Sequence, residues 1–141
     1  MTLLLWLLLA GGADRVRPLP TATPGVRRLL TRTTVCGTRW GLDRRHVTTA
    51  MKKQVFAAYG IAWAEHARYE VDHLIPRELG GADDVANLWP QPWTGAQNAH
   101  MKDRLENALH RQVCAGELSL EHAQEAIRSD WIAAFRLYVA Q

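Results

Sequence analysis

The sequence predicts a single α+β domain. Two observations carry that prediction. A strand-like run at 68–74, a Gly-Gly pair and a second short apolar run at 85–89 read as a hairpin, and helical periodicity fills the chain from about residue 97 onward. At 141 residues and 48% hydrophobic residues, the chain is long enough to bury one core and too apolar to be disordered.

The first 13 residues have the pattern of a secretory signal. Leu3 to Ala10 is a continuous apolar run, and small residues follow it at 11–13. The run is too short to span a bilayer, which takes about 20 residues, and no Lys or Arg precedes it. We therefore expect an exported protein, with an uncleaved anchor or a cytoplasmic protein as the alternatives.

Residues 14–32 are expected to form a linker, with the folded domain at 33–141. Pro18, Pro20, Pro24 and Gly25 interrupt this stretch, and it shows no core-forming periodicity. After it, residues 48–60 predict a helix that Thr48 or Thr49 caps and Gly60 ends. Its apolar face consists of Met51, Val55 and Tyr59.

The hairpin is predicted from alternation and turn residues. In 68–74, apolar or aromatic residues alternate with acidic ones, and Pro76 ends the run. Gly80-Gly81 turns the chain, and 85–89 is the expected return strand, stopped by Pro90 and Pro92.

Three helices are expected after the hairpin. In the first, apolar residues recur every four positions until Gly116 breaks the pattern: Met101, Leu105, Leu109 and Val113. Ser119 can cap the second, which runs through Ile127. Ser129 or Asp130 can cap the third, which runs through Val139.

The two cysteines, Cys36 and Cys114, lie far apart in the sequence. They cannot form a four-cysteine zinc site within one chain. In an exported protein we expect them to form a disulfide, whereas in a cytosolic one they would be small buried residues.

The end of the first strand carries the residues of chemical interest. Asp72 and His73 are adjacent, and Asn87 follows in the return strand. Hydrolysis of a phosphodiester needs a base for the attacking water, and His73 is a candidate. Asp72 offers a hard oxygen ligand for a divalent ion, and Asn87 can fix the loop that aims His73.

The first turn of the following helix supplies the opposite wall. Asn98 and His100 are the two candidates for the third metal-site residue. Asn98 serves equally well as a plain helix cap. The choice between Asn98 and His100 as the third metal-site residue therefore stays open. Lys102 and Arg77 are candidates for phosphate contacts.

This order of residues resembles the HNH endonuclease family, the ββα-metal nucleases. The resemblance rests on Asp72-His73, Gly80-Gly81, Asn87 with the Trp-Pro that follows it, and a Lys-Asp-Arg-Leu-Glu segment that begins at Lys102, and it covers the chain from about Cys36 onward. It implies cleavage of DNA, with RNA as an alternative, and one divalent ion: Mg²⁺ first, then Mn²⁺, Zn²⁺ or Ni²⁺. The chain lacks the two Cys-x-x-Cys pairs that many members use for a structural zinc.

The alternative function is a catalytically inactive ββα module that binds nucleic acid or a protein. The formal net charge of +3 and the isoelectric point near 9.2 permit nucleic-acid binding without arguing strongly for it.

Overall fold

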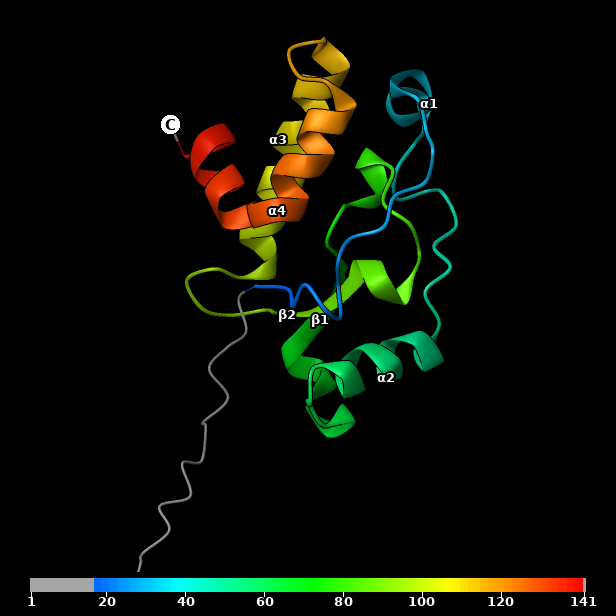
Figure 1. Ribbon diagram of the computed structural model, residues 1–141, viewed down its shortest axis with the longest axis vertical. Helices are drawn as coiled ribbons and strands as arrows, with labels where there is room; N and C mark the ends of the chain where they lie inside the picture. Colours follow the sequence, from blue (N-terminus) through cyan, green and yellow to red (C-terminus); the bar gives the residue numbers. More distant parts are fainter. Residues whose placement is uncertain (1–16, 141) are drawn as a thin grey trace, which may run out of the picture.

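The computed structural model describes residues 17–140 and shows an α+β arrangement (Figure 1). One two-stranded antiparallel hairpin is combined with several helices, as predicted. The expected signal segment at 1–13 lies outside the described residues. None of the helices within 17–140 is long and apolar enough to cross a membrane.

The hairpin lies between two groups of helices (Figure 1). In chain order, the main elements are α1 (Arg32–Gly37), α2 (Thr49–Ala58), β1 (Tyr69–His73), β2 (Leu88–Pro92), α3 (Ala99–Ala115) and α4 (Leu120–Tyr138). Three short 3-10 helices join them: η1 (Trp63–Arg68), η2 (Arg77–Leu79) and η3 (Val85–Asn87). A small apolar cluster joins α2 to the hairpin, and a larger one joins α1, α3 and α4 to the loop after β1.

Helix ends follow the predicted capping residues. Thr48 accepts a hydrogen bond from the N–H of Met51 and begins α2, and Ser119 begins α4 in the same way. Gly116 ends α3 in a left-handed conformation, with φ +80°. Asp130 is non-helical within α4 and accepts from the N–H groups of Ile132 and Ala133, so it caps the predicted last helix.

The return strand begins three residues later than predicted. Residues 85–87 form η3, and β2 contains the two prolines that were expected to stop it. The register places Pro90 opposite Val71 and Pro92 opposite Tyr69. Hydrogen bonds from Leu74 N to Asn87 O and from Trp93 N to Arg68 O show which residue pairs along the hairpin are hydrogen-bonded and which are not. Both prolines therefore stand where an N–H would point away from β1, so the ladder loses nothing.

The Gly-Gly pair is required by the backbone. Gly80 has φ +87°, which favours glycine. At Gly81, a Cβ atom would lie 1.7 Å from the carbonyl oxygen of Ile75. The loop after β1 can therefore fold back on itself only with glycine at this position.

The described part of the expected linker belongs to the fold, so the prediction of a domain beginning at 33 was wrong. Thr23 is fully buried and donates a hydrogen bond to the carbonyl of Leu88. Arg27 forms a β-bridge with Gly81, and Gly25 N donates to Ala86 O. Proline and glycine make this segment irregular, but its backbone groups still find partners along the loop between the strands.

The predicted disulfide between Cys36 and Cys114 is present and joins α1 to the last turn of α3. Their Cα atoms lie 5.6 Å apart, within the usual range for a disulfide. Arg32 reinforces the same junction, because its Nε and Nη2 donate to the carbonyls of Val113 and Cys114 at 2.7 and 2.8 Å.

Candidate functional site

A polar pocket of about 190 Å³ opens at the end of β1. Its walls come from β1, the loop after it, the segment before α2 and the middle of α3. The charged lining residues include Arg45, Glu70, Asp72, His73, Arg77, Asp103 and Glu106. Alternation along β1 sends Asp72 and His73 to opposite faces of the strand. Both still line this pocket because it lies at the end of the strand.

His73 is buried and paired with a carboxylate. Its Nε2 lies 2.7 Å from Oδ1 of Asp83, in the loop between the strands. The other carboxylate oxygen of Asp83 accepts a hydrogen bond of 2.6 Å from the backbone N–H of His46. An ionised Asp83 accepts the Nε2 proton, which leaves Nδ1 as the basic nitrogen of a ring that lines the pocket.

The protonation states favour this arrangement. Burial lowers the pKa of His73 and outweighs the opposing effect of the hydrogen bond that His73 donates to Asp83, so the imidazole is neutral at pH 7. Burial alone would raise the pKa of Asp83. The hydrogen bonds that His46 and His73 donate to Asp83 outweigh the effect of burial, and the pKa of Asp83 is therefore lowered. A neutral histidine beside an ionised aspartate can accept a proton.

Asn87 braces the strand end, as predicted. Its Oδ1 accepts from the backbone N–H groups of Ile75 and Val26, at 3.0 and 3.2 Å. Its Nδ2 donates to the carbonyls of Ile75 and Ala82, at 3.0 and 3.1 Å. The side chain is fully buried, and all four bonds go to backbone. It therefore positions the loop and does not contact a substrate.

Lys102 holds the other side of the strand end. Its Nζ donates to Asp72 Oδ2 and to the carbonyl of His73, both at 2.7 Å, and to Glu106 Oε1 at 2.5 Å. The side chain is fully buried, and these bonds use all three of its protons. Lys102 cannot reach a phosphate, so the prediction of a phosphate contact was wrong. It fixes Asp72 and the backbone of His73 instead.

One ammonium is shared by two partly buried carboxylates. Burial disfavours the charged Lys102, but the charges of Asp72 and Glu106 outweigh it and raise the pKa of the lysine. Burial raises the pKa of Glu106, and the Lys102 charge only partly opposes that effect. A carboxyl group with a raised pKa holds its proton more readily, so Glu106 relieves the excess negative charge around the single ammonium.

Two further carboxylates face the same region. Burial raises the pKa of Glu70 to about 7, and the neighbouring charge of Asp72 adds to the effect. Burial likewise raises the pKa of Asp103, again with a contribution from Asp72. Crowded carboxylates with raised pKa values gain stability from a bound cation.

The structure does not bring Asn98 or His100 to this pocket. Asn98 is the N-cap of α3: its Oδ1 accepts from Met101 N at 3.1 Å, and its Nδ2 donates to Gly95 O. The side chain of His100 is 72% exposed and lies near Trp93. Neither lines the pocket. The expectation that one of them completes the site with Asp72 is corrected, because α3 faces the pocket one turn further on, at Asp103 and Glu106.

Arg77 lines the pocket as expected of a phosphate contact, but it already has partners. Its Nη2 donates to the Asp43 carboxylate and to Arg44 O, and its Nε lies 3.4 Å from Asp83 Oδ1. The side chain is 16% exposed. Its role toward a phosphate stays a prediction.

Sequence reasoning missed Asp83, Glu70 and Glu106. Asp83 lies in a loop, ten residues after His73, and no periodicity marks such a contact. Glu70 could have been found, because it lies two residues before Asp72 on the same strand face. Glu106 lies one helical turn after Lys102, the usual spacing of an ion pair.

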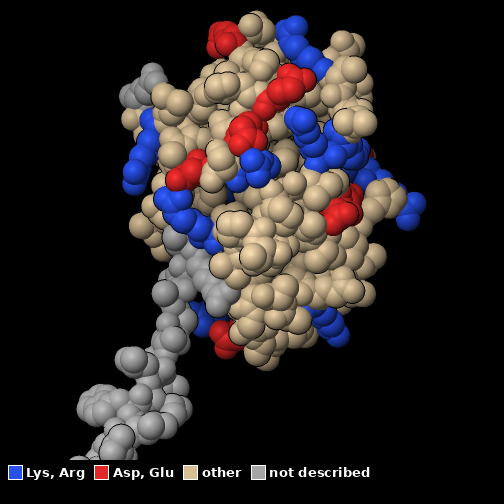
Figure 2. All heavy atoms as spheres, in the orientation of Figure 1, with Lys and Arg blue, Asp and Glu red and all other residues tan. Residues whose placement is uncertain are grey.

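A larger cavity of about 400 Å³ lies between the N-terminal segment and α4, lined by Pro20, Thr23, Leu74 and Trp131 among others. No histidine lines it, so the chemistry favours the smaller pocket. On the face seen in Figure 2, acidic and basic side chains are mixed over the upper half, and the lower half is mostly uncharged. This face therefore shows no large basic surface for a long nucleic acid.

Known proteins offer no further guide. Comparisons with protein-family models, with curated proteins and with solved structures found no match for this chain. The function must therefore be argued from the residues and the geometry.

Proposed function

We propose that the protein is a divalent-metal-dependent endonuclease that hydrolyses DNA, built on a ββα core of the HNH type. The observation that carries the proposal is that the buried His73, which is paired with Asp83, lines a pocket beside Asp72. The order of hairpin and following helix, with Asn87 bracing the strand end, agrees with the resemblance seen in the sequence.

The donor set fits a hard cation. The pocket offers carboxylate oxygens from Asp72, Glu70 and Asp103, and Mg²⁺ prefers oxygen ligands. These atoms do not form a close three-donor group within residues 17–140. An ion held here would use one or two carboxylates, with water and phosphate oxygens as its other ligands, which is usual for Mg²⁺. A bound divalent ion would neutralise charge on the phosphate and on the leaving alkoxide.

The chain's own residues supply the proton transfer. His73 Nδ1 accepts the proton of the attacking water, and Asp83 stabilises the imidazolium that forms. Lys102 donates to both the carboxylate of Asp72 and the carbonyl of His73, so the carboxylate and the base keep their separation. Arg77 adds positive charge at the pocket wall.

Plasmid nicking tests the proposal. Purified protein is incubated with supercoiled DNA and Mg²⁺ or Mn²⁺, with EDTA in a parallel reaction. Cleavage is expected with the metal and not with EDTA, and His73→Ala should lower its rate about 10²- to 10⁴-fold. Cleavage that persists in EDTA would contradict the metal's role.

Asp83→Asn separates positioning from chemistry. The variant keeps the shape of the side chain but removes the charge that stabilises protonated His73. We expect slower cleavage and a change in its pH profile, while Asp84→Asn, a loop variant that alters a cap of η3, should keep the wild-type profile. Identical profiles for Asp83→Asn and wild type would remove Asp83 from the mechanism.

The second candidate is a ββα module that binds without cleaving. It is favoured by the lack of a close three-donor carboxylate group in the pocket within the described residues. Binding of DNA that weakens steeply with salt, with no cleavage under any divalent ion, would establish it.

We also propose that the protein is exported. The disulfide supports this, because such bonds persist in oxidising compartments. The mass of the mature protein under non-reducing conditions tests it: loss of about 13 residues and two protons is expected. A full-length chain with free thiols would contradict it.

A further inference from the structure

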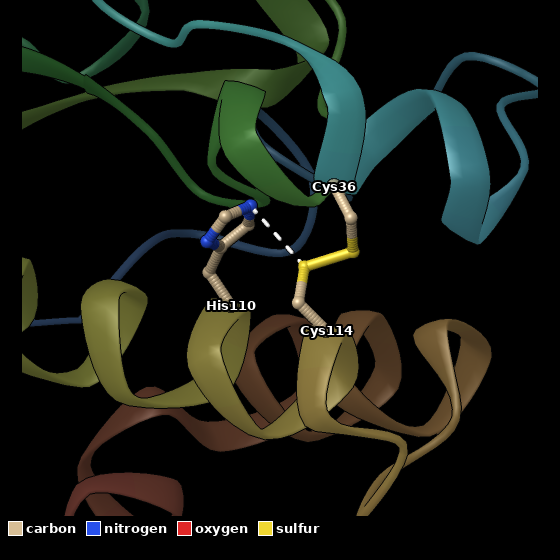
Figure 3. A group of neighbouring side chains, drawn as sticks. All are labelled: Cys36, His110 and Cys114. Carbon is tan, nitrogen blue, oxygen red and sulfur yellow. Dashed lines mark hydrogen bonds between the residues drawn. A yellow bond between two sulfur atoms is a disulfide. The ribbon is translucent and has the colours of Figure 1, made fainter.

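The junction of α1 and α3 carries a second cluster, separate from the pocket. His110 precedes Cys114 by four residues on α3, and its Nε2 lies 3.6 Å from Cys114 Sγ (Figure 3). Cys36 reaches the same place from α1. Within residues 17–140, this is the one group of three His, Cys, Asp or Glu residues whose ligand atoms all lie within 4.8 Å of one another.

We propose that this junction has two alternative states: a disulfide when oxidised, and a zinc site when reduced. In the reduced state one Zn²⁺ is bound by the thiolates of Cys36 and Cys114 and by Nε2 of His110. Thiolate and imidazole are the ligands that zinc prefers, and a water completes the tetrahedron. The proposal does not depend on the nuclease function.

The exchange is chemically balanced. A dithiol reductant gives two electrons and two protons to the disulfide and itself becomes a disulfide. Two thiols form, and Zn²⁺ then displaces their two protons into solvent. Nε2 of His110 also lies 3.4 Å from the carbonyl oxygen of Val35 in the oxidised protein. When zinc binds, Nε2 gives its lone pair to the metal and the proton of the neutral ring is on Nδ1.

The geometry needs little change. Two sulfurs on a tetrahedral zinc lie about 3.8 Å apart, given Zn–S bonds of about 2.3 Å. Side-chain rotation can open that space between Cα atoms that are 5.6 Å apart. His110 and Cys114 share one face of α3 because they are one turn apart.

Other contacts keep α1 in place when the disulfide opens. The guanidinium of Arg32 still donates to the carbonyls of Val113 and Cys114. Val35 is fully buried in the core next to Cys36, and its carbonyl accepts from Trp40 Nε1 at 2.7 Å. The three ligands therefore stay close together without the covalent bond.

Cobalt binding tests the proposal. The full chain is reduced with a phosphine, freed of reductant without air, and titrated with Co²⁺. One Co²⁺ per chain should bind with thiolate-to-cobalt charge-transfer absorption, and Zn²⁺ should displace it. The oxidised protein should show no such band. Ions bound only by the carboxylates of the pocket give no thiolate band.

His110→Ala identifies the third ligand. The variant should bind Co²⁺ at least about tenfold more weakly, or lose the tetrahedral type of spectrum. The control is His122→Ala, on α4, which should bind as the wild type does. Equal affinity in His110→Ala and wild type would overturn the assignment.

Folding is followed by circular dichroism during the titration. A reduced chain that stays folded with two free thiols and takes up no Co²⁺ would overturn the proposal. So would a reduced chain that unfolds and does not refold when Co²⁺ or Zn²⁺ is added.

Discussion

Two of the contacts that helix α3 makes with the rest of the molecule are held by different means. In its first half, Lys102 and Glu106 bury charge against the end of the hairpin. In its last turn, Cys114 is bonded covalently to α1. The first junction depends on protonation and the second on redox state. The ion pairs and the disulfide therefore hold the same helix separately, and a substitution can remove either one without removing the other.

The largest expected effect comes from Lys102→Met. It leaves Asp72 and Glu106 without their shared cation, and removing one partner of a buried ion pair typically costs about 3–5 kcal/mol. Urea denaturation at pH 7 measures the loss, which should shrink at low pH as the carboxylates become protonated. Lys52→Met on α2 is the control and should stay within about 0.5 kcal/mol of wild type. Equal stability of the two variants would contradict the role of Lys102.

A smaller loss of folding stability is expected from Cys36→Ser combined with Cys114→Ser. The bond joins residues 78 apart, and removing such a disulfide costs about 2–5 kcal/mol. Urea denaturation of this variant with and without reductant should give one value, whereas reductant should weaken the wild type. A wild type that reductant leaves unchanged would show that α1 is held by its other contacts alone.

The smallest effect concerns Glu70 and has a defined sign. Its pKa in the folded state is raised from 4.5 to about 7, so the folded chain holds a proton that the unfolded chain has lost. This favours folding at low pH, and the contribution disappears as pH rises from 4.5 to 7. Glu70→Gln should therefore gain stability relative to wild type over that range, by on the order of 1 kcal/mol after solvent screening.

Urea denaturation at several pH values checks the Glu70 prediction. Glu117→Gln, at an exposed position after α3, is the matched control and should follow the wild type. Mg²⁺ should reduce the difference between Glu70→Gln and wild type if the pocket binds it. A difference that is the same at pH 4.5 and pH 7 would contradict the raised pKa.

The sequence predicted the elements well because they depend on local signals. Thr48, Ser119 and Asp130 each cap a helix as expected. The strand β2 was misplaced because proline was taken to end it, whereas position along a ladder decides whether proline fits. The segment before α1 was misjudged because proline and glycine content predicts irregular backbone but does not show whether that backbone packs on the core.

The candidate site was predicted only in part. His73, Asp72 and Asn87 meet at the strand end, and the cysteines pair, as expected. The partner of His73 was not foreseen, because Asp83 lies in a loop whose path depends on tertiary packing. The residues by which α3 lines the pocket were predicted one turn too early in the helix. The rotation of α3 about its axis is set by the hairpin it packs against, and the sequence does not show it.

We infer that the reactive site is the pocket around His73 and not the first turn of α3. Nicking rates of His73→Ala and His100→Ala, measured side by side with Mg²⁺ on supercoiled plasmid, test it most directly. We predict that His73→Ala loses about 10²-fold or more of the rate and that His100→Ala keeps it. Loss of cleavage in His100→Ala with activity retained in His73→Ala would contradict the claim.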